Sequence, residues 1–318
     1  TAGNASIEWI TSEPGVHGAV MAGDVVALTS TSPDTPGAVV SIGGLTDRSR
    51  DFSLRTFVES PCITPRPRWQ GHGKQTRSAL FLPSDHDGAS ALPVLLDPYG
   101  GPHAQRVLKS HNAHLVSQWF ADQGFAVLVT DGRGTPGRGP TFERAVFGDL
   151  AQPVLDDQLE ALDRVAGEIG FLDLDRVGIR GWSFGGYLAA LAVLRRPDRV
   201  HAAVAGAPVT TWRLYDTHYT ERYLGHPAAH PEHYDRTDLI LEAAALSRPL
   251  LLVHGLADDN VVAAHTLRFS SALLANGCSH SVLPLSGVTH MTSQVTTAEN
   301  LLHLELEFLT AALSSPAA

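Results

Sequence analysis

The sequence predicts an α/β fold in which a mostly parallel sheet is covered on both faces by helices. The first observation is a rhythm, because from about Pro67 short apolar runs alternate with longer amphipathic stretches. The second is that these apolar runs are nearly continuous, which is typical of strands buried on both faces. The third is size, since 318 residues with 43% hydrophobic content suffice for one large domain or two smaller ones.

The beginning of the chain has a different character. Gly23–Thr29 and Ala38–Ile42 are short β-branched runs separated by Gly and Pro clusters, which is the pattern of hairpins. We therefore expect a β-strand segment over residues 1–66 and an α/β domain over residues 67–318. A few short strands are marginally stable alone, and their unpaired edges would favour a homo-oligomer.

The expected elements of the second domain follow the alternation along the chain. Strands are expected at Arg77–Leu82, Val94–Asp97, Ala126–Thr130, Val177–Arg180, Ala202–Ala205, Leu250–His254 and Ser281–Leu285. Helices are expected at His114–Gln123, Val154–Glu168, Phe184–Arg195, Ala263–Ala275 and Ala298–Ala312.

Composition limits the partners and the compartment. The formal net charge of −10 would repel a nucleic-acid backbone, and apolar runs such as Leu92–Leu96 are far shorter than the ~20 residues of a membrane span. Two cysteines, Cys62 and Cys278, cannot form a disulfide framework. With no basic start or apolar stretch in Thr1–Ile10, we expect a cytoplasmic location and neither a nucleic-acid nor a membrane partner.

The strongest chemical signal is the hexapeptide Gly181-Trp182-Ser183-Phe184-Gly185-Gly186. It lies between an expected strand and an expected helix, which is the setting of a nucleophile elbow. Glycine at 181 and 185 removes Cβ atoms that would collide in so sharp a turn. We predict that Ser183 is a nucleophile and that the Phe184 N–H stabilises an oxyanion. The alternative is a Gly-rich turn with an idle serine.

A serine hydroxyl needs a base, and the base needs an orienting acid. Downstream of Ser183 the chain supplies Asp258 and Asp259 after one expected strand and His290 after the next. Both loops follow strand C-terminal ends, where α/β sheets place their sites. We expect His290 to act as general base, with one of the two aspartates fixing its tautomer. Spacing does not separate the two, and a helix N-cap cluster is the alternative interpretation of these residues.

A second oxyanion donor is expected from a loop after an earlier strand. Tyr99, in the Gly-rich loop after Val94–Asp97, could direct its hydroxyl at the developing charge. A structural tyrosine is the alternative here, as ordinary aromatic packing is for Tyr215, Tyr219 and Tyr223.

Six ordered segments together resemble the prolyl oligopeptidase family, and most closely its dipeptidyl peptidase IV branch. They are DPYGGPHAQ (97–105), DGRGTPGRG (131–139), GWSFGGY (181–187), DTHYTERYLG (216–225), HGLADDNV (254–261) and the GVTH that ends at His290. The resemblance extends from about Arg66 to Leu313. It implies an α/β-hydrolase fold and a serine peptidase that cleaves short peptides through an acyl-enzyme, often after proline.

The resemblance also implies a role for each site residue. It makes Ser183 the nucleophile, Asp258 rather than Asp259 the acid, and His290 the base, with the Tyr99 hydroxyl and the Phe184 N–H in the oxyanion hole. Phe184 stands where that branch usually carries Tyr, so the pocket wall loses a hydroxyl. Asn260 would contact a substrate carbonyl, and the other implied substrate-binding residues are Trp182, Val209, Trp212, Tyr215, Tyr219 and Val261.

One departure from the family pattern bears on specificity. The family carries a β-propeller before the hydrolase domain, and in the dipeptidyl branch two propeller glutamates grip the substrate N-terminus. Here residues 1–66 resemble only a last propeller blade, so we expect a piece of a longer enzyme or a naturally short relative. A carboxylesterase with the same triad and a truncated, inactive module are the alternatives.

Other motifs predict no further chemistry. His226, His230 and His233 could form a metal cluster, but Pro227 and Pro231 would break a helix that aligned them. The glycines around Arg133 and Arg138 lack the Lys-Ser/Thr of a phosphate loop. We expect no metal and no cofactor.

Overall fold

The computed structural model describes residues 9–44, 51–55, 63–72 and 76–314. Contacts divide the chain into two units, one of residues 1–65 with 108–119 and the other of residues 66–107 with 120–318. The division of the sequence at residue 66 stays a prediction, because the contact units also place residues 108–119 with the first unit. Of the two cysteines, Cys62 lies outside the described residues and Cys278 is a half-buried free thiol.

The first unit contains a four-stranded antiparallel meander. Its hairpins are tight: Ala22 pairs with Val25 across a two-residue loop in which Gly23 has φ 57°. A positive φ at this position suits the primed turns that join antiparallel strands. The strands, paired in this order, are β1 (Val16–Ala22), β2 (Val25–Ser32), β3 (Thr35–Gly44) and β4 (Phe52–Arg55).

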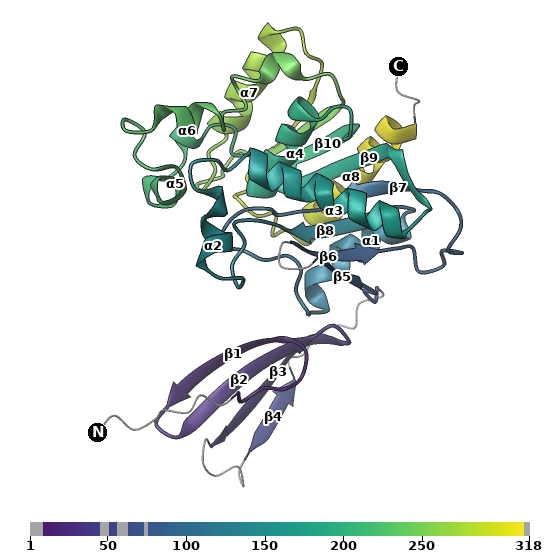
Figure 1. Ribbon diagram of the computed structural model, residues 1–318, viewed down its shortest axis with the longest axis vertical. Helices are drawn as coiled ribbons and strands as arrows, with labels where there is room; N and C mark the ends of the chain where they lie inside the picture. Colours follow the sequence, from purple (N-terminus) through teal and green to yellow (C-terminus); the bar gives the residue numbers. More distant parts are fainter. Residues whose placement is uncertain (1–8, 45–50, 56–62, 73–75, 315–318) are drawn as a thin grey trace. The chain divides into compact units, whose positions relative to one another are not determined.

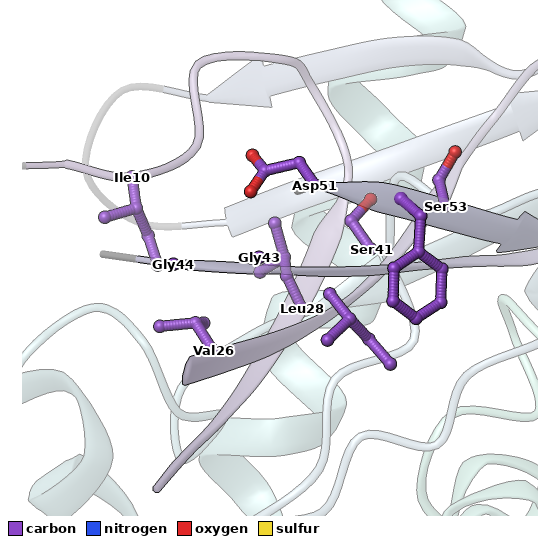
Figure 2. A pocket seen from close by; sticks show the side chains of 10 residues that line it. Ile10, Val26, Leu28, Ser41, Gly43, Gly44, Asp51 and Ser53 are labelled. Carbon is purple, nitrogen blue, oxygen red and sulfur yellow. The ribbon is translucent and has the colours of Figure 1, made fainter. Parts of the chain in front are cut away.

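A cavity of about 350 Å³ lies within this meander (Figure 2). Val26, Leu28 and Phe52 give it an apolar wall, and Asp51 is its one ionisable lining residue.

The second unit is built on an eight-stranded sheet. Its order is β12-β11-β10-β9-β7-β8-β6-β5, in which β5, β6 and β8 are antiparallel neighbours and all other pairs are parallel. The mostly parallel sheet predicted from the sequence is therefore confirmed. The strands are β5 (Arg68–His72), β6 (Thr76–Phe81), β7 (Leu92–Leu96), β8 (Ala126–Asp131), β9 (Leu172–Trp182), β10 (Ala202–Gly206), β11 (Leu250–Gly255) and β12 (Ser281–Leu285).

Helices cover both faces of this sheet, as expected (Figure 1). The α-helices are α1 (Leu115–Asp122), α2 (Pro140–Glu143), α3 (Gln152–Glu168), α4 (Phe184–Arg195), α5 (Thr217–Leu224), α6 (Pro231–Asp235), α7 (Ala264–Ala275) and α8 (Val295–Ser314). Short 3₁₀ turns are η1 (Asn112–His114), η2 (Arg144–Val146), η3 (Trp212–Leu214) and η4 (Ala243–Ala245). None of the helices in the described part of the chain is long and apolar enough to cross a bilayer.

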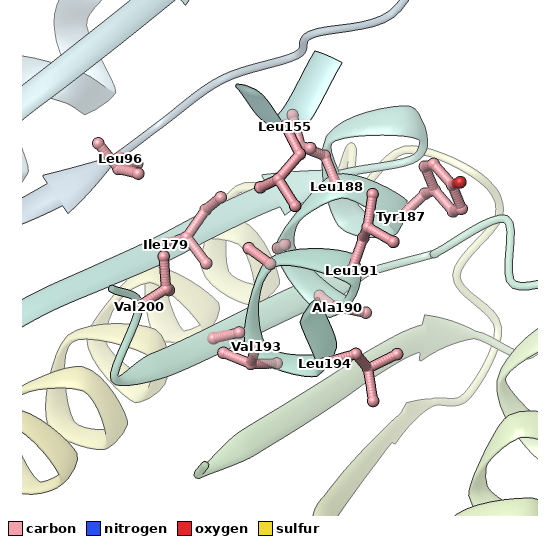
Figure 3. Packing of buried hydrophobic residues seen from close by; sticks show 14 of the residues in the cluster. Leu96, Leu155, Ile179, Tyr187, Leu188, Ala190, Leu191, Val193, Leu194 and Val200 are labelled. Atoms are coloured by element: carbon pink, nitrogen blue, oxygen red, sulfur yellow. The ribbon is translucent and has the colours of Figure 1, made fainter. Parts of the chain in front are cut away.

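The side chains of strand β9 show which helices pack on each face of the sheet. Side chains alternate along a strand, so Val177 and Ile179 join the core under α3 and α4. A Cβ added at Gly178 would instead meet Leu313 and Leu309 of α8. Figure 3 shows the first of these layers, where α4 packs its leucines against the sheet. Residues 184–194 of α4 are all buried, as expected of a helix that is apolar on every side.

On the α8 face, one arginine joins three elements. Arg180 of β9 donates to Asp97 Oδ1 at 2.9 Å and to Glu305 Oε2 of α8 at 2.8 Å, and its guanidinium lies 4.8 Å from the Phe120 ring. Burial opposes the charge on Arg180, but the two carboxylates outweigh it and raise the pKa of the guanidinium. Because Asp97 also pairs with Arg106 at 2.8 Å, this network fixes the chain directly before Tyr99.

Candidate active site

Ser183 occupies the sharp turn between β9 and α4. Its φ of 59° and ψ of −116° are unusual for a residue with a side chain. The turn requires the neighbouring glycines: a Cβ at Gly181 would overlap the Gly185 carbonyl, and a Cβ at Gly185 would lie 2.6 Å from the Pro98 carbonyl oxygen. The backbone is held by the Ser183 N–H, which donates to the Gly206 carbonyl at 2.8 Å. The sequence therefore imposes strain that presents one hydroxyl at the end of the sheet.

An aspartate and a histidine meet on the loops after β11 and β12. Asp258 Oδ2 lies 2.8 Å from His290 Nδ1. Asp258 Oδ1 accepts from the backbone N–H groups of Asn260 and Val261 at 3.0 and 2.9 Å. Since a carboxylate only accepts, Nδ1–H of His290 is the donor, and Nε2 is left as the basic nitrogen.

The same contacts separate the two adjacent aspartates. Asp258 is 6% exposed and points inward to His290, whereas Asp259 is exposed to solvent. Sequence spacing alone did not decide which aspartate orients His290, and the orientation of the loop favours Asp258.

The histidine loop is also tied to the serine turn. The Trp182 indole N–H, one residue before Ser183, donates to the His290 carbonyl at 2.7 Å. The Ala257 N–H donates to the Val288 carbonyl at 3.0 Å, which joins the acid loop to the histidine loop. The three segments that carry Ser183, Asp258 and His290 are therefore linked by hydrogen bonds to backbone carbonyls, and the Trp182 side chain helps to position the histidine loop.

Behind the acid lies a second histidine that the sequence analysis did not single out. His254, the penultimate residue of β11, has Nε2 2.7 Å from the Val261 carbonyl and Nδ1 2.7 Å from Thr266 Oγ1. The carbonyl fixes the proton on Nε2, which lies 3.6 Å from Asp258 Oδ2. Burial lowers the pKa of His254, which keeps it neutral. Its place four residues before Asp258 at the end of an apolar strand was the signal that could have indicated it.

Tyr99 and Phe184 approach each other from different elements. Tyr99 lies in the loop after β7, with its ring centroid 6.0 Å from that of Phe184, the first residue of α4. A Cβ on Gly101 would lie 2.7 Å from Phe184 and 2.8 Å from Tyr99, so glycine is needed for the two to pack. Burial, reinforced by Tyr215 and Tyr223, raises the pKa of Tyr99 to about 12. Its hydroxyl therefore stays protonated as a donor at neutral pH.

An aromatic cluster extends from this point. Trp212 stacks on Tyr219 with centroids 5.9 Å apart at 18°, and Tyr215 meets Tyr219 edge-on at 5.4 Å. Tyr215 donates its hydroxyl to Asn260 Oδ1 at 3.1 Å, next to the acid loop. Four of the implied substrate-binding residues, Trp212, Tyr215, Tyr219 and Asn260, are thus connected by direct contacts.

These pocket residues differ in how accessible they are. Val209, Trp212 and Val261 are at most 2% exposed and belong to the buried core against which Tyr215 and Tyr219 pack. Tyr215 and Tyr219 are partly exposed and form its accessible wall.

His103 is a further residue that the sequence analysis missed. It has an unusual φ of 71°, its Nε2 lies 3.5 Å from the Tyr99 hydroxyl, and its ring meets Tyr219 edge-on at 5.3 Å. A lone histidine in a Gly-Pro loop gives no periodic signal, and its contacts arise only from the folded loop.

Comparison with known proteins places this geometry in a family. The model of the prolyl oligopeptidase family matches residues 111–316, which is well over half of the chain. The chain belongs to the prolyl oligopeptidase family. The resemblance read from the six segments is thereby confirmed, and with it the α/β-hydrolase fold.

Two curated relatives and one solved structure show how far the similarity to this family extends. Mouse (Mus musculus) dipeptidyl peptidase 8 is 42% identical over 206 residues, covering 62% of this chain and 23% of that protein. Human (Homo sapiens) prolyl endopeptidase FAP is 31% identical over 228 residues, covering 71% of this chain and 30% of that protein. The crystal structure of Porphyromonas gingivalis dipeptidyl peptidase 4 superposes with a TM-score of 0.83 at 28% identity, covering 94% of this chain and 44% of that one. The chain thus spans between 23% and 44% of the length of these family members.

Proposed function

We propose that this chain is the catalytic part of a serine peptidase of the prolyl oligopeptidase family that cleaves short peptides after proline. The observation that carries the proposal is the buried Asp258 carboxylate 2.8 Å from His290 Nδ1, on loops joined to the strained turn of Ser183. Relatives named as dipeptidyl peptidases and a prolyl endopeptidase support the substrate class.

In the proposed reaction, Ser183 Oγ attacks the scissile carbonyl carbon as His290 Nε2 takes its proton. Asp258 stabilises the imidazolium that forms. The Phe184 N–H and the Tyr99 hydroxyl donate to the oxygen as it becomes negative. His290 then gives its proton to the leaving amine as the C–N bond breaks. Water attacks the acyl-enzyme as His290 takes its proton, and this proton passes to Ser183 Oγ when the acid product leaves.

Specificity for proline is proposed to come from the aromatic cluster. A proline ring is flat-sided and apolar, and the accessible rings of Tyr215 and Tyr219 offer it an aromatic wall backed by Trp212. Because Asn260 accepts from Tyr215 through Oδ1, its Nδ2 amine can donate to a substrate carbonyl.

Matched kinetics test the proposal. We expect the purified chain to hydrolyse a glycyl-prolyl p-nitroanilide faster than the glycyl-alanyl analogue, with the activity lost in Ser183→Ala. A clear preference for a short-chain p-nitrophenyl ester over both anilides would reject the peptidase in favour of an esterase.

We also propose a cytoplasmic location and small-peptide substrates, without a nucleic-acid partner. The support is compositional: two cysteines in 318 residues and a net charge of −10. A homo-oligomer is proposed to form through the edge strands β1 and β4 of the meander. Light scattering on the chain eluting from a sizing column decides this, and a monomer at high concentration would reject it.

A further inference from the structure

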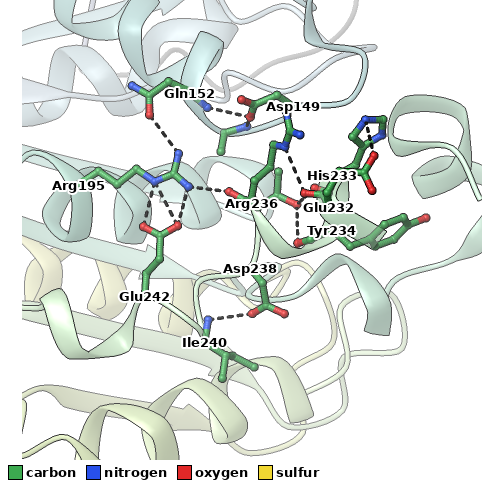
Figure 4. A network of polar contacts seen from close by, with 12 residues as sticks. Asp149, Gln152, Arg195, Glu232, His233, Tyr234, Arg236, Asp238, Ile240 and Glu242 are labelled. Carbon is green, nitrogen blue, oxygen red and sulfur yellow. Dashed lines mark hydrogen bonds and ion pairs between the residues drawn. The ribbon is translucent and has the colours of Figure 1, made fainter. Parts of the chain in front are cut away.

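Helix α6 brings three metal-binding side chains together outside the residues of the proposed reaction. His230, Glu232 and His233 each offer one ligand atom, and these atoms lie within 4.8 Å of one another. Glu232 Oε1 lies 3.6 Å from His230 Nδ1 and 3.5 Å from His233 Nε2. Figure 4 shows Glu232 and His233 together on this helix.

The structure corrects the expectation that proline would keep these histidines apart. Pro231 does not interrupt a helix but begins α6, at a position where its missing N–H costs nothing. His230 is the N-cap and His233 follows three residues later, so both lie on one side of the turn. The third histidine of the sequence cluster, His226, is not part of the group.

The separations suit a tetrahedral metal ion. Zinc bonds of about 2.0–2.2 Å at tetrahedral angles place neighbouring ligand atoms about 3.4 Å apart. Both separations to Glu232 Oε1 are within about 0.2 Å of that value. In this conformation the two imidazole rings are stacked, with centroids 4.7 Å apart and planes at 7°, so their nitrogen lone pairs do not converge on one point. The side chain of His230 is 44% exposed, so it is free to turn toward an ion held by Glu232 and His233.

The protein also fixes the tautomer of His233 that a metal requires. His233 Nδ1 lies 2.8 Å from the Leu224 carbonyl at the end of α5, and a carbonyl can only accept. The proton therefore lies on Nδ1, and Nε2 keeps the lone pair beside Glu232. A carbonyl on the second nitrogen is the usual outer-shell support of a metal-bound histidine.

Two further features hold the site open and in place. A Cβ at Gly148 would lie 3.1 Å from His233 Nε2, so glycine leaves room at the ligand atom. Behind α6, Arg195 donates to the Arg236 carbonyl at 2.6 Å and is itself paired with Glu242 (Figure 4).

We propose that His230, Glu232 and His233 form a zinc site, with water completing the coordination. Two imidazoles and one carboxylate are a donor set that binds Zn²⁺ with an open fourth position. The three ligands all lie at the start of α6, and His233 also contacts the Leu224 carbonyl at the end of α5, so a bound ion holds His233 in the orientation that makes this contact.

Isothermal titration of the EDTA-stripped full chain with ZnCl₂ tests the site. We expect one tight site in the unchanged chain and at least a tenfold weaker affinity in Glu232→Gln and in His230→Ala, by comparison with the about 10–100-fold loss for outer-shell partners. His226→Ala is the matched control and should bind as the unchanged chain does. Zinc should also raise the melting temperature of the unchanged chain and of His226→Ala but not of the other two variants.

Two results would overturn the proposal. One is tight binding that survives both Glu232→Gln and His230→Ala, which would place the ion among other histidines. The other is loss of binding in His290→Gln, which would place the ion at the triad. Because the side chains of His230 and Glu232 are 44% and 54% exposed, both variants should retain the circular dichroism spectrum of the unchanged chain in EDTA.

Discussion

The choice between the two adjacent aspartates gives a sharp prediction about the triad. Replacing Asp258 with Asn keeps the size of the side chain but removes the charge 2.8 Å from His290 Nδ1. At an effective dielectric constant of 20, two charges about 4 Å apart attract by about 4 kcal/mol. Loss of this term alone slows formation of the imidazolium by about 10³-fold. An amide that donates to Nδ1 would also impose the wrong tautomer, which brings the expected loss of kcat to about 10⁴-fold.

The matched control is Asp259→Asn, which removes the same charge from an exposed position one residue away. We expect kcat/KM on the glycyl-prolyl anilide to change less than about twofold in this variant, because an exposed charge is screened by water. A fall in kcat of less than tenfold in Asp258→Asn, or equal losses in the two variants, would refute the assignment of the acid.

Three further predictions concern the oxyanion donor, the buried ion network and a buried histidine. Tyr99→Phe should lower kcat by about 10²–10³-fold, and an unchanged kcat would exclude this hydroxyl as an oxyanion donor. Ultraviolet titration should detect no Tyr99 phenolate below pH 10, because burial raises the pKa of Tyr99 to about 12. Arg180→Met leaves Asp97 and Glu305 without their shared partner. Urea denaturation should show that the free energy of unfolding falls by about 3–5 kcal/mol. A loss below about 1 kcal/mol would show that water reaches the two carboxylates. Burial, with a contribution from His254, lowers the pKa of His265 from 6.5 to about 4. The unfolded chain therefore takes up the proton at a higher pH than the folded chain, and stability falls as the pH drops from 6.5 to 4. At about 1.4 kcal/mol per pH unit the loss approaches about 3 kcal/mol, and His265→Asn should flatten this part of the urea–pH profile; an unchanged slope would contradict the shift.

The centre of the sheet was predictable from the sequence because its strands are buried on both faces. Ala202–Ala205 and Leu250–His254 were located within one residue of β10 and β11, since continuous apolar runs leave little choice of end. The missed strands β1, β4 and β5 lack that signal. β1 is exposed at nearly every position and β4 at all four, and β5 carries arginine, glutamine and histidine at an antiparallel edge.

Some residues of the candidate active site were predictable from the sequence, and others were not. The position of Ser183 followed from the glycines that its turn requires, and His290 from its place after the last strand. The choice of Asp258 over Asp259 depended on which way a loop side chain points, which spacing does not encode. His103 and His254 were missed because their partners, Tyr99 and Asp258, reach them only through folded loops. Pro231 was predicted to break a helix near His230 and His233, but it is the first residue of α6, a position that proline favours.

Covalent labelling tests the central claim most directly, namely that His290 makes Ser183 a nucleophile. The chain is treated with diisopropyl fluorophosphate, and the modified residue and the rate are read by mass spectrometry. We predict one adduct, on Ser183, whose rate of formation falls by several orders of magnitude in His290→Gln. An adduct formed equally fast in His290→Gln, or none on Ser183 in the folded chain, would contradict the account.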